Sequence, residues 1–131
     1  MKSRHELRET IFRILFQMEN TDLEISELLD LEESDIADNE YVNTTLAGIF
    51  TNREQIDSII ENNLKDWKLD RLSKMDRQIL RIATYEILFS DIPYKVSINE
   101  AVELSKIYSE KDDSYKFING VLKGIVETSV K

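Results

Sequence analysis

Cysteine is absent from this chain of 131 residues, and glycine, proline and histidine are scarce, with three, one and one residue respectively. Without cysteine there is no disulfide, no thiolate nucleophile and no cysteine-based zinc site. So few glycines and prolines disfavour a sheet protein rich in tight hairpins, and they favour helices joined by short polar turns. The single histidine, His5, excludes a metal site built on a histidine pair.

Long hydrophobic runs are also missing. The first residues, MKSRHELRETIFRILF, carry charges throughout and contain no apolar stretch typical of a signal peptide. No window approaches the ~20 apolar residues that a membrane span needs. The length is that of one domain. These features predict a soluble cytoplasmic protein.

Negative charge is plentiful, but it is unevenly placed. The net charge is −9, and residues 21–66 carry thirteen Asp/Glu against two Lys/Arg. Residues 1–20 and 67–131 each have a net charge of +1. The two ends of the chain can therefore form a locally positive face that attracts an anion. An ordinary solvated surface of mixed charge explains the same counts.

A repeated pattern marks candidate helix starts. Ser or Thr precedes Glu or Asp by three residues at five places: Ser3, Thr21, Thr51, Ser73 and Ser97. In a capping box the hydroxyl accepts from the third residue's N–H, and the acid reaches back to the N–H of the cap. Each match precedes apolar residues at helical spacing, so each predicts a helix start.

Hydrophobic periodicity then predicts an all-α protein. The apolar stripes indicate about seven helices, at about 3–19, 23–30, 39–50, 52–65, 74–90, 97–108 and 114–127. The run EESDIADNE at 32–40 is predicted to be a turn or loop, and Trp67 and Leu69 a packed connection. Because the fifth helix is apolar on more than one face, we expect it at the centre of two antiparallel helical bundles. The expected domain spans residues 1–131, with an N-terminal part of about 1–70 and a C-terminal part of about 71–131.

No residue pattern indicates an active site. Asp112 and Asp113 are better explained as a helix cap than as metal ligands, and Glu86 on the fifth helix is expected to be hydrogen-bonded within the structure. The three glycines are isolated in helical stretches, where close packing explains them better than a phosphate loop does. We therefore expect a protein that is not an enzyme and that needs no cofactor and no metal.

Recognition remains as the function class. Arg4 and Arg8 are four residues apart and so share one face of the first helix. Lys116 and Phe117 stand at the start of the last helix, where free N–H groups also favour an anion. Basic groups beside an aromatic ring are suited to single-stranded RNA, because the charges follow phosphates and the ring stacks on a base. A helical module that binds only proteins is the alternative.

The segment DRQILRIATYEILFSDIPYKVSINEAVELSKIYSEKDDSYKFINGVL, residues 76–122, resembles the NusB family of bacterial transcription antitermination factors. The ILRIATYE helix, the IPYKVSINEAVELSK stretch and the DSYKFINGVL ending are the most specific parts. The resemblance extends over nearly the whole chain and is lowest at 21–40. It implies an all-helical, non-enzymatic protein that pairs with the ribosomal protein NusE. The pair binds boxA RNA in nascent ribosomal RNA leaders and joins the RNA polymerase elongation complex to prevent premature termination.

The resemblance also implies roles for single residues. RNA-facing positions fall on Arg4, Arg8, Phe16, Asp113, Ser114, Lys116 and Phe117. Partner-facing positions fall on Asp70, Asp76, Tyr94 and Lys95. Phe16 stands where the family usually has tyrosine, so a hydroxyl contact is lost there. Some members of the family self-associate, so the resemblance also allows a homodimer.

Overall fold

The computed structural model describes residues 2–65 and 68–129, and Trp67 lies outside them. The described residues form eight α-helices and one 3-10 helix, with no strand among them, so the all-α prediction is confirmed. The elements are α1 (Arg4–Asn20), α2 (Ile25–Asp30), α3 (Ser34–Ala37), α4 (Glu40–Thr51), α5 (Arg53–Asn62), η1 (Leu69–Arg71), α6 (Lys74–Phe89), α7 (Tyr94–Tyr108) and α8 (Ser114–Ser129). No helix within the described ranges is long and apolar enough to cross a membrane.

Two of the five expected caps are present. Ser3 forms a complete capping box with Glu6, and the Ser73 hydroxyl accepts a hydrogen bond from the backbone N–H of Asp76. The predictions for Thr21 and Thr51 are wrong. Thr21 is the C-cap of α1 and donates its hydroxyl proton to the Gln17 carbonyl of that helix, and Thr51 is the last residue of α4.

The prediction that Ser97 starts a helix is also wrong. Helix α7 begins at Tyr94, directly after Pro93. A proline has no N–H to satisfy and its φ is already helical, so the chain can turn into a helix at this point. Ser97 is therefore inside the first turns of α7, where it is buried and donates its hydroxyl proton to Glu86.

The predicted loop at 32–40 contains a short helix, α3, that the sequence analysis missed. Its single apolar residue of any size, Ile36, is 6% exposed. Burying this side chain favours one helical turn in a segment that is otherwise acidic.

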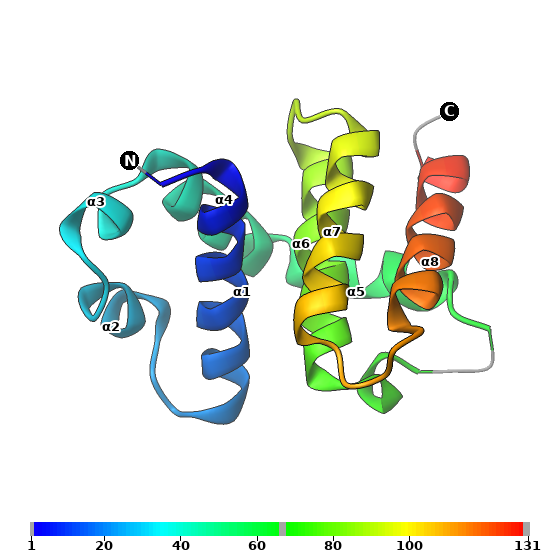
Figure 1. Ribbon diagram of the computed structural model, residues 1–131, viewed down its shortest axis with the longest axis horizontal. Helices are drawn as coiled ribbons and strands as arrows, with labels where there is room; N and C mark the ends of the chain where they lie inside the picture. The colour runs from blue at the N-terminus through cyan, green and yellow to red at the C-terminus, as the bar shows by residue number, and fades with distance from the viewer. Residues whose placement is uncertain (1, 66–67, 130–131) are drawn as a thin grey trace.

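Helix α6 is the central helix, as predicted. Every residue from Gln78 to Ile87 is buried, and α6 packs against α1, α4, α5, α7 and α8. Figure 1 shows α6 and α7 between α1 on one side and α8 on the other, with α2, α3 and α4 grouped around α1. The core is continuous, since side chains of α1, α4, α5, α6, α7 and α8 belong to one hydrophobic cluster.

Close packing at one glycine gives a stability prediction. A methyl group added at Gly48 would overlap the ring of Tyr85, whereas one added at Gly120 would meet nothing within 4 Å. We expect Gly48→Ala to lower the free energy of unfolding by about 1–3 kcal/mol, because the buried ring has to move. Gly120→Ala should raise it by up to about 1 kcal/mol through helix propensity. Urea unfolding of both variants measures the difference, and equal midpoints would contradict the packing argument.

Candidate nucleic-acid interface

A cavity of about 360 Å³ lies where the start of α6 meets the connection between α7 and α8. We call it the α6–α8 cavity. Five residues predicted to face RNA or a partner line it: Asp76, Asp113, Ser114, Lys116 and Phe117. The rest of the lining consists of Arg71, Leu72, Ser73, Glu110 and Lys111. Residues that are 37 or more positions apart in sequence therefore share one site. Asp70 is exposed beside it in η1.

The α6–α8 cavity is polar and of mixed charge. Three cations, Arg71, Lys111 and Lys116, and three acids line it. Asp76 is 8% exposed, and the Ser109 hydroxyl donates a hydrogen bond of 2.5 Å to it. Phe117 is half-buried and packs against the core, so only part of its ring is available to a ligand. This arrangement can hydrogen-bond both a phosphate and the N–H groups of a protein.

The start of α1 forms a second polar site. Arg4 is exposed, and its guanidinium carbon lies 4.0 Å above the centre of the Tyr41 ring. The stacking contact orders the side chain without neutralising its charge. Arg4 and Tyr41 line a hollow of about 440 Å³ together with Glu86 and Ser90. Arg4 is therefore an exposed cation that can contact an anion.

The phosphate contact predicted for Arg8 requires exposure that this structure does not give it. Arg8 is 3% exposed and donates two hydrogen bonds to Glu86, of 2.9 and 3.0 Å, and one of 3.1 Å to Glu100. Burial alone would lower the pKa of Arg8. The hydrogen bonds to Glu86 and the negative charge of Glu86 outweigh the effect of burial, so the pKa of Arg8 is raised. Arg8 thus anchors α1 to α6 and α7, and any role in RNA binding is indirect.

Glu86 is hydrogen-bonded within the structure, as expected. It is 1% exposed and accepts from Arg8, from the Tyr41 hydroxyl at 2.5 Å and from the Ser97 hydroxyl at 2.8 Å. Burial and the Glu86 carboxylate together raise the pKa of Tyr41. We call Glu86 and these three partners the Glu86 cluster. It joins α1, α4, α6 and α7 at one point.

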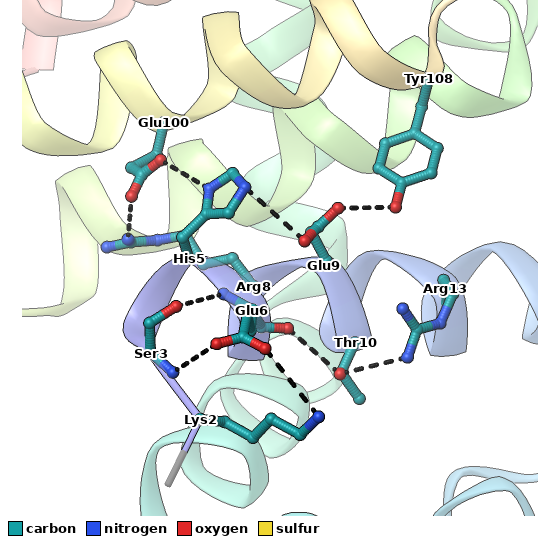
Figure 2. A network of polar contacts seen from close by, with 10 residues as sticks. All are labelled: Lys2, Ser3, His5, Glu6, Arg8, Glu9, Thr10, Arg13, Glu100 and Tyr108. Atoms are coloured by element: carbon teal, nitrogen blue, oxygen red, sulfur yellow. Dashed lines mark hydrogen bonds and ion pairs between the residues drawn. The ribbon is translucent and has the colours of Figure 1, made fainter.

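Glu100 extends these contacts to the surface of α1. Figure 2 shows its carboxylate between Arg8 and His5, with His5 also directed toward Glu9. Glu9 in turn accepts a hydrogen bond of 2.7 Å from the Tyr108 hydroxyl, which raises the pKa of Tyr108. The exposed Arg4 therefore stands on a helix whose inner face is fixed to α7 along its first turns.

Phe16 lies further along α1 and is half-buried. Its ring stacks on Phe12, with 6.2 Å between the centroids, and Phe12 contacts Tyr108 at 4.8 Å. Phe16 is therefore the outermost of three rings that connect α1 to the end of α7.

The predicted RNA-facing residues fall into two groups. In Figure 1 the start of α1, which carries Arg4, lies near the top, and the α7–α8 connection, which includes Asp113, lies at the bottom. The structure brings together Asp76 and the residues from Asp113 to Phe117, and it leaves Arg4 at the other end of α7. A ligand that contacts both groups has to run along the length of this helix.

No metal centre is evident in the described part of the chain. Residues 2–65 and 68–129 contain no group of three His, Asp or Glu side chains that could hold a metal ion.

The model of the NusB family matches residues 5–127. The chain belongs to the NusB family. Among curated relatives, the transcription antitermination protein NusB of Staphylococcus carnosus is 50% identical over 127 residues, which cover 94% of this chain and 98% of the relative.

Solved structures of the NusB family share this fold. T. maritima NusB superposes with a TM-score of 0.88 at 36% identity and covers 99% of this chain and 94% of that chain. A chain from a crystal structure of the antitermination factors NusB and NusE in complex with double-stranded RNA superposes with a TM-score of 0.78 at 30% identity. The match covers 95% of this chain and 96% of that one.

Tyr94 and Lys95, predicted as partner contacts, lie in neither polar site. They line a groove of about 690 Å³ between α7 and α8, and Tyr94 is 40% exposed. The groove also holds Lys106, Tyr115 and Lys123, which the sequence analysis did not single out. Lys106 comes from α7 and Tyr115 and Lys123 come from α8, so no spacing within one helix could have indicated the set.

Proposed function

We propose that this protein is a transcription antitermination factor that binds boxA-type single-stranded RNA together with the ribosomal protein NusE. The observation that carries the proposal is the α6–α8 cavity. In a chain of the NusB family, it gathers Asp76 with Asp113, Ser114, Lys116 and Phe117, to which the family resemblance assigns partner and RNA contacts. The name of the Staphylococcus carnosus relative supports the antitermination function, and the solved complex of NusB and NusE with double-stranded RNA supports RNA and NusE as partners.

Each type of site residue makes a different kind of contact in this proposal. Arg4 and Lys116 are exposed cations that neutralise phosphates, which makes the affinity dependent on salt. The accessible part of the Phe117 ring stacks on a base, and Phe16 offers a second ring on α1. Asp113 hydrogen-bonds the RNA and Asp70 accepts hydrogen bonds from NusE. Ser114 and Asp76 are only 7% and 8% exposed, so they add to these contacts through the atoms that open into the cavity. Arg8 contributes by holding α1 in place.

The acidic segment 21–66 supports a composite site. It forms α2, α3, α4 and α5 and carries thirteen Asp/Glu against two Lys/Arg. This acidic surface is complementary to a basic partner, so NusE brings further positive charge to the RNA site when it docks. The assembled complex then joins elongating RNA polymerase on ribosomal RNA leaders. No reaction is catalysed in this scheme, and a homodimer of the free protein would compete with it.

Arg4 gives a direct test of this function. We expect a boxA strand to bind in fluorescence anisotropy more tightly than a scrambled strand, mainly when NusE is present. Arg4→Ala should weaken boxA binding and reduce the slope of log K against log salt by about 0.7, since one phosphate contact is lost. Lys65→Ala is the matched control, because Lys65 is an exposed cation in the connection after α5.

The outcome separates two functions. Binding of boxA that is unaffected by Lys65→Ala and weakened by Arg4→Ala supports direct RNA contact. No preference for boxA at either of two salt concentrations, with NusE bound, would contradict it. The protein would then be an adaptor that contacts only other proteins.

A further inference from the structure

The groove between α7 and α8 is the largest hollow described above and has no role in the function proposed so far. We call it the α7–α8 groove. Its volume is about 690 Å³, and its walls come from successive turns of both helices: Tyr94, Lys95, Ile98, Asn99, Val102, Lys106, Tyr115, Lys116, Asn119, Lys123, Val126 and Glu127. Glu127 is the single acid among these lining residues. The groove is therefore strongly basic in a chain whose net charge is −9.

The lysines of the α7–α8 groove are free to bind an external anion. Across residues 2–65 and 68–129, none of Lys95, Lys106, Lys116 and Lys123 lies within 4.0 Å of a carboxylate oxygen. In contrast, Arg8, Arg77 and Arg81 all form ion pairs with buried or half-buried acids. The fold neutralises its inner cations itself and leaves four exposed ones together in this groove.

Aromatic rings and amides lie between these lysines. The ammonium nitrogens of Lys106 and Lys116 lie 5.1 Å and 6.0 Å from the centroid of the Tyr115 ring. Tyr94 is exposed at the other end of the groove, and Asn99 and Asn119 add side-chain donors and acceptors. Cations that follow a backbone, with rings for stacking between them, are the features that single-stranded nucleic acid requires.

We propose that the α7–α8 groove binds a single-stranded RNA segment that flanks the one held at the α6–α8 cavity. This inference rests on the proposed function. Lys116 lines both hollows, so a strand that leaves the cavity at this lysine enters the groove. RNA offers phosphates to the lysines and a base at every nucleotide to the tyrosines, whereas an acidic peptide pairs with the lysines but has no regularly spaced rings to stack on the tyrosines. Tyr94 and Lys95 then contact RNA and not the protein partner.

The test compares two RNA lengths on the complex with NusE. One RNA holds the boxA sequence alone, and the other carries eight additional uridines at each end. The groove variant is Lys106→Gln/Lys123→Gln, because neither lysine lines the α6–α8 cavity. The control is Lys65→Gln/Lys68→Gln, which removes the same charge from exposed positions outside the groove.

With the long RNA, the groove variant should lose about 1.4 from the slope of log K against log salt, as expected for two phosphate contacts. The short RNA and the control variant should show little change. Tyr94→Leu should raise the dissociation constant of the long RNA by about fivefold or more, which corresponds to the loss of one stacked base. A photo-crosslink from thiouridine in the added ends to Tyr94 or Tyr115 would place the strand directly.

Three results would overturn the proposal. The control variant could lose as much affinity as the groove variant, which would mean that only net charge matters. The groove variant could bind both RNAs as the wild type does, which would leave the boxA function intact and remove the groove from it. The groove variant could change the oligomeric state in sedimentation and leave RNA binding unchanged, which would make the groove an interface between copies. If the wild-type complex binds neither RNA, the proposed function itself fails.

Discussion

Glu86→Gln should lower the free energy of unfolding by about 3–5 kcal/mol, the largest effect that we expect from a single substitution. The glutamine has nearly the same shape, so the packing of α6 is retained. The loss comes from the charge of Arg8, which stays 3% exposed and keeps only Glu100 as a carboxylate partner. Tyr41 and Ser97 also donate to a weaker acceptor. Urea unfolding followed by circular dichroism measures the change.

Two further variants show whether the effect arises from the buried pair. Glu103→Gln makes the same chemical change at an exposed position of α7 and should alter stability by no more than about 0.5 kcal/mol. Arg8→Met/Glu86→Met removes both charges and should be less destabilising than the sum of the single substitutions. A wild-type urea midpoint for Glu86→Gln would mean that the Glu86 cluster does not hold the helices together.

The second large effect concerns pH, because burial and Glu86 raise the pKa of Tyr41. In the unfolded chain the phenol loses its proton above its ordinary pKa of 10.0, while in the folded protein it stays protonated. The unfolded state then binds fewer protons than the folded state, so stability falls as the pH rises. The expected slope is about 1.4 kcal/mol per pH unit, or roughly 2–3 kcal/mol between pH 10 and pH 12.

Tyr41→Phe isolates this contribution from the other groups that titrate at high pH. The variant loses the hydrogen bond to Glu86 and should be less stable than the wild type at pH 8 by about 1–2 kcal/mol. The gap between the two proteins should then narrow above pH 10, since phenylalanine has no proton to lose. Tyr94→Phe, which removes an exposed hydroxyl, serves as the control. A gap that stays constant up to pH 12 would contradict the raised pKa of Tyr41.

Periodicity alone predicted most of the helices and the central place of α6, because a long helix with several apolar faces has to be surrounded. The errors at Thr51 and Ser97 have a common origin. A hydroxyl followed three residues later by an acid favours a helix start, but the same pair also occurs at the end of a helix, as at Thr51, and inside one, as at Ser97. Ser97 bonds Glu86, a partner eleven residues away, which a local pattern does not contain.

The site was predictable only in part, for a similar reason. Spacing placed Arg4 and Arg8 on one face of a helix but did not say how far that face turns inward, and the structure buries Arg8 while exposing Arg4. The assignment of Asp76 together with the segment 113–117 came from the family resemblance, since no periodicity relates the two. The α7–α8 groove depends on how two helices pair, and neither helix alone reveals it.

The Glu86 cluster has a consequence for how the chain can vary. Arg8 and Tyr41 lie in the first half of the sequence, while Glu86 and Ser97 lie in the second. The first half alone has no Glu86 carboxylate to pair with buried Arg8, and the second half alone has no Arg8 guanidinium to pair with buried Glu86. An exchange of halves between related proteins therefore works only if both parents keep the same set of donors and acceptor. We therefore expect these four positions to change together in evolution, although the first and the last are 89 positions apart in the sequence.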